Sequence, residues 1–161
     1  MNIFERREQV LIKRKKEVFA EYMEVDVDRI VLLNDEMDRF TFDVFEDIAL
    51  TRIIHESEFL KFVVEQLNSS FVLRCGFDEF EGAVEPSFFA KVTGISEDVF
   101  SLLIKAGASD SIKSIVERTV GVFDFAQKAL DYYGIGRFAN FYMTDEPYLI
   151  TEDGFYLYTL C

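Results

Sequence analysis

The sequence predicts an α+β fold: a mostly helical single domain over residues 1–161 that ends in a C-terminal antiparallel β-hairpin or three-stranded meander. Apolar residues recur at three- and four-residue spacings through much of the chain up to about residue 133, which is the period of helices packed on a core. An Asp153-Gly154 pair separates two β-prone runs, which is a strong hairpin signal. Half of the 161 residues are apolar, enough for one core without metal or disulfide bonds. We divide the chain into an N-terminal helix (1–24), a helical body (25–135) and a β meander (136–161).

An amphipathic helix is predicted over residues 3–23. Its apolar residues recur at steps of three, four and seven and therefore share one stripe: Phe4, Leu11, Ile12, Val18, Phe19, Tyr22 and Met23. The basic run 13–16 resembles a nuclear-localisation or phosphate-binding sequence. Consecutive helical residues circle the axis at about 100° steps, so we interpret the run as solvated rather than as one basic face.

The pattern of residues 25–41 leaves two interpretations open. A hairpin that turns across Asn34–Asp38 fits the apolar runs on either side. A helix fits equally well, through apolar residues at helical spacing: Ile30, Leu33, Met37 and Phe40. Over residues 42–55 a helix is predicted from a further group of residues at helical spacing: Phe45, Ile48, Ala49, Arg52 and Ile53.

The next helix is predicted to begin after Ser57 as its N-cap and to end at residues 68–70. A short strand is predicted over residues 71–75. Residues 76–86 contain two glycines and a proline and are predicted to form a loop. This is the most acidic predicted loop of the chain, with Asp78, Glu79, Glu81 and Glu85.

Three helical segments follow. Pro86 suits the first position of a helix over 86–93, which Gly94 ends. Ser96 is the predicted N-cap of a helix that runs to about Lys105, and Ser109 is the predicted N-cap of the next. Whether Gly121 breaks the segment that continues to residue 133 is left open.

The stretch 88–103 resembles the helix-turn-helix of bacterial repressors. It has the small Ala90, the turn residue Gly94 and the inward-facing Phe100 and Leu103 that this geometry needs. The second helix begins Ser96-Glu97-Asp98 and has no Arg, Lys, Asn or Gln before Lys105. Two carboxylates would be repelled by a phosphate-lined groove, so we interpret the segment as a structural helix pair and expect no DNA binding.

The C-terminal residues 148–151 and 155–160 are predicted to pair as a hairpin with a type I′ turn, which needs a positive φ at Gly154. Residues 137–143 would supply a third strand. The stretch 131–138 (DYYGIGRF), with Tyr142 and GFYLY at 154–158, resembles the end of uncharacterised small proteins of bacteriophages and plasmids. Those proteins have a histidine where this chain has Arg137. The resemblance implies an origin on a mobile element and assigns no catalytic residue.

The charge of the chain excludes several classes of function. Thirty acidic and 17 basic residues give a net charge of −13, with about +1 on residues 1–24 and −14 on residues 25–161. Such a chain is repelled by nucleic acid backbones and anionic membranes. No apolar run is long enough to span a membrane, and residues 1–19 do not have the pattern of a signal peptide. We therefore expect a cytoplasmic protein, in the host cytoplasm if it is phage-encoded, with Cys75 and Cys161 reduced.

Enzyme motifs are weak in this sequence. His55 and Cys75 form a possible nucleophile–base pair, but both lie in apolar contexts that favour structural roles. No dinucleotide-binding or P-loop motif occurs, and the spacing in the acidic loop is not that of an EF-hand. We predict no catalytic residue, no cofactor and no metal.

The hypothesis that follows is a non-enzymatic acidic interaction protein. It would be an inhibitor from a phage or mobile element that mimics nucleic acid and occupies the basic groove of a nucleic-acid-handling host protein. A helix-turn-helix-derived regulator that acts through protein contacts is the alternative, and a small metal-dependent enzyme using loop 76–86 is a second alternative. Oligomeric state is left open. The predicted partner-binding residues are Asp78, Glu79, Glu81, Glu85, Tyr156 and Tyr158.

Overall fold

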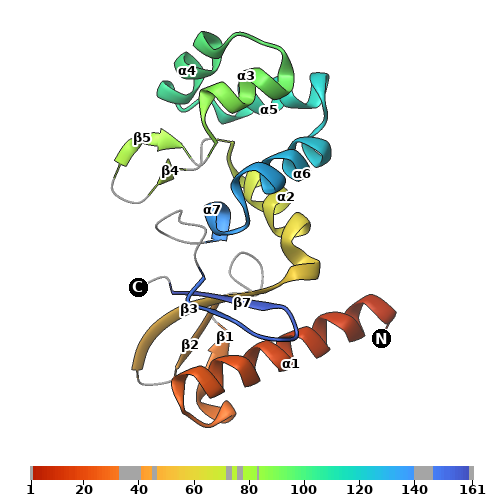
Figure 1. The fold of residues 1–161 in the computed structure, drawn as a ribbon, viewed down its shortest axis with the longest axis vertical. Coiled ribbons are helices and arrows are strands. Elements are labelled where there is room, and N and C mark those ends of the chain that lie inside the picture. The colour runs from red at the N-terminus through yellow and green to blue at the C-terminus, as the bar shows by residue number, and fades with distance from the viewer. Residues whose placement is uncertain are drawn as a thin grey trace. The chain divides into compact units, whose positions relative to one another are not determined.

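A computed structural model of the chain describes residues 2–32, 41–44, 47–71, 74–75, 78–82, 84–139 and 147–159 (Figure 1). The chain divides into two compact units. Unit 1 comprises Met1–Ser57 and Glu146–Cys161, and unit 2 comprises Glu58–Asp145. Each unit combines helices with antiparallel strands, which confirms the predicted α+β class.

Unit 1 packs a long helix on an antiparallel sheet. In the described residues the strand order is β1-β2-β3-β7-β6. The predicted hairpin is confirmed as β6 and β7, and β7 also pairs with β3, with Ile53 opposite Leu157. The elements are α1 (Ile3–Met23), a 3-10 turn (Val27–Arg29), β1 (Ile30–Leu32), β2 (Thr41–Val44), β3 (Asp47–His55), a 3-10 turn (Glu56–Glu58), β6 (Leu149–Ile150) and β7 (Phe155–Thr159).

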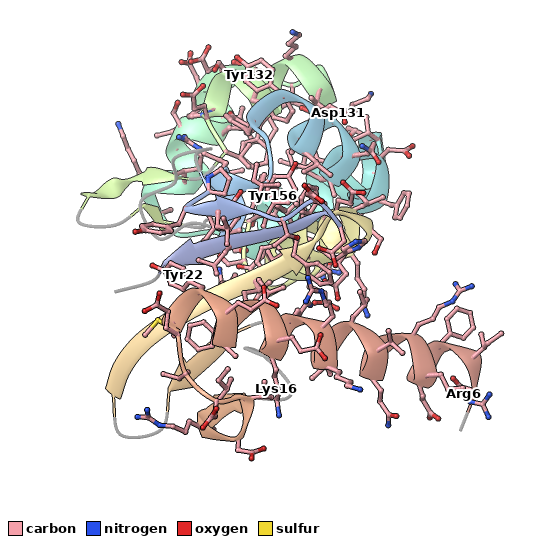
Figure 2. The ribbon with its side chains drawn as sticks, turned by 60° about the horizontal axis from the view of Figure 1, so that its bottom comes forward. Arg6, Lys16, Tyr22, Asp131, Tyr132 and Tyr156 are labelled. Atoms are coloured by element: carbon pink, nitrogen blue, oxygen red, sulfur yellow. The ribbon has the colours of Figure 1, made fainter. Side chains whose placement is uncertain are left out.

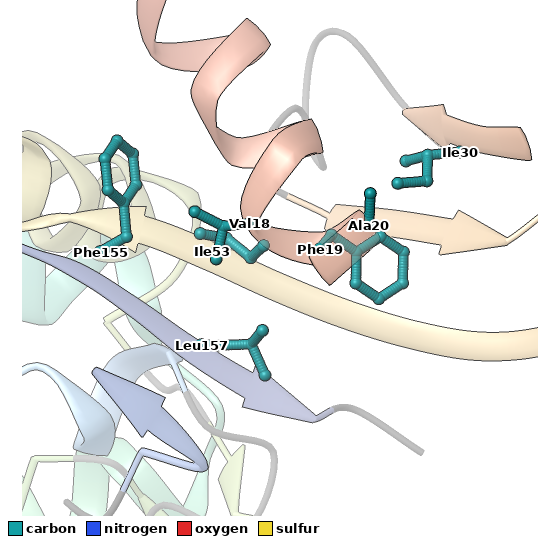
Figure 3. Close-up of a cluster of buried hydrophobic side chains, with 7 residues drawn as sticks. All are labelled: Val18, Phe19, Ala20, Ile30, Ile53, Phe155 and Leu157. Carbon is teal, nitrogen blue, oxygen red and sulfur yellow. The ribbon is translucent and has the colours of Figure 1, made fainter. Parts of the chain in front are cut away.

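The part of α1 that packs on this sheet begins at Leu11. Asn2 and Glu5 form a capping box that starts the helix, because each side chain accepts a hydrogen bond from the other residue's backbone N–H. Residues 2–10 are exposed, and Figure 2 shows Arg6 on the end of α1 that extends past the strands. The buried cluster begins further along the helix (Figure 3) and consists of Val18, Phe19, Ala20, Ile30, Ile53, Phe155 and Leu157.

The turn between β6 and β7 differs from the prediction. Gly154 has the expected positive φ of 85°, but neither Glu152 nor Asp153 has a positive φ, as a type I′ turn would require. The Gly154 N–H donates to the Thr151 carbonyl and the Thr151 N–H donates to the Phe155 carbonyl. This is the pattern of a type I turn followed by a left-handed glycine. The location of the turn is confirmed, and the type I′ assignment is wrong.

The helix predicted over residues 42–55 is also wrong, because this segment forms β2 and β3. Ile53 and Ile54 are adjacent in β3 and both are fully buried. A strand buried on both faces lacks the alternation of polar and apolar residues that identifies strands in a sequence. The antiparallel pairing of β1 with β2 favours the hairpin interpretation of residues 25–41, although its turn at 34–38 lies outside the described residues.

Two further predictions of the body and the meander need correction. The segment 76–86, predicted as a loop, contains β5 (Asp78–Gly82), which pairs with β4 (Arg74–Cys75). The third strand predicted over 137–143 is contradicted over Arg137–Ala139, which belong to α7 (Gly136–Ala139); residues 140–143 lie outside the described residues. The assignment of 25–135 as a helical body therefore fails, because strands lie at both β1–β3 and β4–β5.

Unit 2 consists mainly of short helices. The helices over 86–93 and 96–105 lie at their predicted positions, and Gly121, with φ of 84°, separates α5 from α6. Of the three serines predicted as N-caps, Ser96 occupies the N-cap position of α4, although its side chain makes no capping hydrogen bond. Glu58 is the N-cap of α2 in place of Ser57, and Ala108 is the N-cap of α5 in place of Ser109. The helices are α2 (Phe59–Ser69), α3 (Pro86–Thr93), α4 (Glu97–Lys105), α5 (Ser109–Thr119), α6 (Val122–Tyr133) and α7.

The core of unit 2 is aromatic. The ring of Phe89 stacks between Phe100, at 5.0 Å between centroids, and Phe125, at 5.2 Å. Phe71 packs against the same cluster, and its backbone N–H donates to the Ser109 hydroxyl. Across the part of the chain that the structure describes, none of the helices has both the length and the apolar character needed to cross a membrane.

Candidate functional site

The predicted acidic residues of segment 76–86 lie in unit 2. Asp78, Glu79 and Glu81 belong to β5. Glu85 is exposed at the N-cap of α3, and its backbone N–H donates to the Tyr133 hydroxyl at 3.0 Å. Burial is the main reason why the pKa of Tyr133 is raised. The backbone at Glu85 is thus fixed against α6 (Val122–Tyr133).

The two predicted tyrosines lie in unit 1, on β7. Tyr156 is half-buried, whereas Tyr158 is only 1% exposed. A partner that docks on the surface needs exposed side chains, so Tyr158 does not belong to an exposed recognition surface. The six predicted residues are therefore divided between the two units.

The helix-turn-helix-like segment forms α3 and α4, as predicted. Gly94 ends α3 with φ of 77°, and α4 begins three residues later. Phe100 is fully buried and Leu103 half-buried. Glu97 and Asp98 are exposed at the first turn of α4, where the helix dipole favours negative charge. Their positions are explained by helix stability without any partner.

His55 holds the turn between β6 and β7. Its Nε2 lies 2.8 Å from the Asp153 carbonyl oxygen, and its Nδ1 lies 2.7 Å from the Ser57 hydroxyl. A carbonyl only accepts, so Nε2 carries the proton and Nδ1 accepts from the Ser57 hydroxyl and backbone N–H. Cys75 lies in the other unit, on β4. These contacts support the structural interpretation of His55.

A groove lies at the C-terminal end of α1 in unit 1, with a volume of about 480 Å³. We call it the acidic groove. Four carboxylates and one basic residue line it, together with small apolar side chains: Glu17, Ala20, Glu21, Glu24, Val25, Asp26, Val27 and Arg29. Glu17, Glu21 and Glu24 share one face of α1 because they are four and three residues apart.

No family model, curated protein or solved structure matches this chain. The chemistry of the groove must therefore be interpreted from its own residues. Among the described residues, no three or more His, Cys, Asp or Glu side chains are grouped so that they could hold a metal ion. The carboxylates are spread along the groove, which suits several cationic side chains better than one metal ion.

The charge of the acidic groove opposes the local helix dipole. The last turn of α1 contains no basic residue, although the C-terminal end of a helix carries a partial negative charge that favours Lys, Arg or His. Glu21 and Glu24 stand there instead. Carboxylates at this end each cost a few tenths of a kcal/mol up to about 1 kcal/mol. Their interaction with the helix dipole is therefore unfavourable, in contrast to that of Glu97 and Asp98.

Glu24 also has an unusual backbone conformation. It is the C-cap of α1 with φ of 55°, and among the described residues it is the one non-glycine residue with a positive φ. Glycine is usual at left-handed helix ends, and other residues cost about 1–2 kcal/mol there. The following Val25 N–H donates to the Ala20 carbonyl, which turns the chain back along the end of α1 and forms the wall of the groove.

Arg14 links α1 to the β6–β7 turn. Its Nε lies 2.9 Å from Asp153 Oδ2, and its Nη1 lies 3.4 Å from Glu17 and 3.6 Å from Glu21. One guanidinium thus faces three carboxylates and leaves excess negative charge at the groove. The hydrogen bond from Arg14, assisted by Thr151, lowers the pKa of Asp153 to about 2, and the same contact raises the pKa of Arg14.

We expect the Asp153 contact to make unit 1 sensitive to acid. The folded pKa of about 2 lies below the ordinary 3.8, so the contact stabilises the fold above pH 4 and this contribution is lost as the pH falls towards 2. Asp153→Asn should melt at a lower temperature than the wild type at pH 7 and should lose less stability between pH 4 and pH 2. Thermal melts at both ends of this range measure the effect. Glu152→Gln, which changes the neighbouring turn carboxylate, should keep the wild-type profile; identical profiles for Asp153→Asn and the wild type would contradict the prediction.

The carboxylates of the acidic groove are not among the residues predicted from the sequence. Acids at spacings of three and four are common on solvated helix faces, so Glu17 and Glu21 gave no distinct signal. The available signal was the combination of acidic residues and no basic residue in the last helical turn. The wall formed by Val25 and Val27 depends on how the chain turns after Glu24, which periodicity does not predict.

Proposed function

We propose that the protein is a non-enzymatic acidic interaction protein that holds a basic segment of a partner protein in the acidic groove. The observation that carries the proposal is the lining of that groove, which contains four carboxylates and one basic residue, Arg29. Its volume of about 480 Å³ lies in the range of ligand-binding pockets. The cost of placing Glu21 and Glu24 against the helix dipole supports a role in binding.

The lining suits Lys and Arg side chains in particular. These side chains have apolar stems and a charged end. Ala20, Val25 and Val27 offer apolar contact for the stems, while the surrounding carboxylates accept hydrogen bonds from the cationic groups. The net charge of −13 would attract a basic partner and accelerate its association.

The partner that we propose is a nucleic-acid-handling protein, as for an inhibitor from a phage or mobile element. Glu17, Glu21 and Glu24 span about 10 Å of helix axis at a rise of 1.5 Å per residue. One strand of a duplex presents about three phosphates over that length. The row of three carboxylates thus matches the charge spacing that a basic nucleic-acid groove is built to bind.

A labelled peptide rich in Lys and Arg is a direct probe of the groove. We expect Glu21→Lys/Glu24→Lys to weaken its binding at least tenfold in fluorescence anisotropy at about 50 mM salt, since four units of charge change at the contact. The matched control is Glu117→Lys/Asp131→Lys, which makes the same change of charge at exposed helical sites in unit 2. The control should weaken binding less than threefold.

Two outcomes of this experiment would contradict the proposal, and a separate competition experiment tests the nucleic-acid mimic. Equal weakening by both pairs would mean that only the net charge matters, and the proposal would fail. A larger loss from Asp78→Lys/Glu79→Lys/Glu81→Lys than from the groove pair would return the site to the segment predicted from sequence. For any protein partner that binds the groove, duplex DNA should compete; a partner unaffected by DNA would contradict the nucleic-acid mimic.

A helix-turn-helix-derived regulator that acts through protein contacts is the second candidate. Ile95 precedes α4, and Val99 and Leu102 lie three residues apart within it; all three are exposed. Helical residues at this spacing share one face. Exposed apolar residues on one face are typical of protein interfaces. A partner whose binding is lost in Val99→Asp/Leu102→Asp and retained in Glu21→Lys/Glu24→Lys would favour this candidate.

A further inference from the structure

The N-terminal half of α1 carries apolar residues that are largely exposed. Ile3 is 63% exposed, Phe4 73% and Val10 67%. A hollow of about 370 Å³ lies along this part of the helix. Three apolar residues, two arginines and one serine line it: Ile3, Val10, Leu11, Arg6, Arg7 and Ser57. Figure 2 shows this end of α1, marked by Arg6, projecting away from the strands. We call the helix face formed by Ile3, Arg6, Arg7 and Val10 the basic apolar segment; Glu5 and Glu8 lie on the other side of the helix.

One face of α1, away from Val18 and Phe19, forms a stripe that we call the seam. Its residues stand at alternating steps of three and four, the positions that meet when two helices pack side by side; four of the seven are charged, and Ala20 is buried in unit 1. In order along the helix the seven residues are Ile3, Arg6, Val10, Lys13, Glu17, Ala20 and Glu24. The seam is basic and apolar at its N-terminal half and acidic at its C-terminal half.

The basic apolar segment and the acidic groove are complementary, but one helix cannot bring them together. Arg6 and Glu24 are separated by 18 residues, which is about 27 Å of continuous α-helix. A second copy of the chain can supply the contact. An antiparallel pair of α1 helices related by a twofold axis would make both contacts at once, because such an interface is self-complementary.

The register of such a pair follows from the sequence. With the twofold axis near residue 15, Arg6 of each copy faces Glu24 of the other, and Lys13 faces Glu17. Val10 then lies at the level of Ala20, a residue that lines the acidic groove. Two helices packed in parallel would instead place Arg6, Lys13, Glu17 and Glu24 each against its own copy. Like charges in these positions disfavour the parallel arrangement.

We propose that two copies of this chain pair through the seams of their α1 helices, antiparallel, with the basic apolar segment of each in the acidic groove of the other. The inference goes beyond the proposed function and does not depend on it, since no partner protein is needed. The acidic body argues for this occupant over an anionic membrane, because about −14 of charge on residues 25–161 repels an anionic surface. At physiological ionic strength, repulsion between the two acidic bodies is screened beyond about 8 Å.

Sedimentation velocity on the whole chain tests the pairing. From about 5 to about 200 µM protein in 0.15 M salt, the wild type should shift from the chain mass of 18.7 kDa to twice that mass. Arg6→Glu/Arg7→Glu should stay monomeric, and so should Glu21→Arg/Glu24→Arg, because each variant opposes like charges across the seam. An equimolar mixture of the two variants should restore the dimer mass.

Lys105→Glu/Lys128→Glu, a matched change on exposed residues of unit 2, should dimerise like the wild type. Circular dichroism should show that all variants are folded.

The remaining outcomes separate this inference from the alternatives. A wild type that stays at 18.7 kDa up to 200 µM, or a mixture that fails to dimerise, would overturn it. Cosedimentation of a monomeric wild type with vesicles containing phosphatidylserine, lost in Arg6→Glu/Arg7→Glu, would assign the basic apolar segment to membranes instead. Arg6→Glu/Arg7→Glu keeps the acidic groove and should still bind the basic peptide, so failure of the pairing is distinguishable from failure of the proposed function.

Discussion

Phe89→Ala is expected to lower the free energy of unfolding by about 3–5 kcal/mol, the range for removing a fully buried aromatic ring. Phe89 is fully buried, and its ring lies within 5.2 Å of the Phe100 and Phe125 centroids with interplanar angles of 13° and 14°. Alanine would leave a cavity between two rings that are fixed on different helices. Urea denaturation followed by circular dichroism measures the change. Phe123→Ala, on the exposed side of α6, should change stability by about 0.5 kcal/mol or less.

The same measurement tests the prediction that residues 1–161 form one domain. Phe19 is fully buried in unit 1, and Phe19→Ala should have a cost similar to that of Phe89→Ala in unit 2. If the chain unfolds as one domain, each variant shifts a single transition. Two transitions, each shifted by only one of the variants, would mean that unit 1 and unit 2 are separate domains.

Gly154→Val should destabilise the chain by about 2–3 kcal/mol. Gly154 has φ of 85°, which costs a residue with a side chain about 1–2 kcal/mol and is especially unfavourable for a β-branched one. A Cβ at this position would also lie 2.7 Å from Glu56 Cδ, so the Glu56 side chain would have to move. Thermal melting and urea titration both report the loss.

Two companion variants separate the causes of this loss. Gly154→Ala retains the backbone strain and the contact with Glu56, while Gly154→Ala/Glu56→Ala removes the contact and leaves the strain. The double variant should recover part of the stability that Gly154→Ala loses, relative to Glu56→Ala alone. Gly154→Val with wild-type stability would contradict the left-handed turn in solution.

The parts of the fold that the sequence predicted well are those with local signals. Helix α3 lies at its predicted residues because Pro86 and Gly94 mark its ends through their own backbone preferences. The hairpin turn is also local, since it is determined by Asp153 and Gly154. Strand β3 could not be predicted in this way, because the burial of both Ile53 and Ile54 depends on strands and helices far away in the sequence.

The candidate site could be predicted less well than the fold. Net charge identified a basic partner as the expected class, but not the residues that would bind it. Asp78, Glu79 and Glu81 are close together in the sequence, which made them the obvious candidates. Glu17 and Asp26 line the same groove only because the chain turns back after Glu24. Neither composition nor periodicity predicts this turn.

The pairing of β3 with β7 has a consequence for the order in which the chain folds. Their paired residues, Ile53 and Leu157, are separated by about 100 positions, and the whole of unit 2 lies between them in the sequence. On the ribosome, the helices of unit 2 can form from nearby residues. Strands β1, β2 and β3 are synthesised early and can pack on α1, but the sheet lacks β6 and β7 until these two strands are synthesised after unit 2. During that interval the part of the buried cluster that Phe155 and Leu157 complete is open to chaperones, to proteases and to other nascent chains.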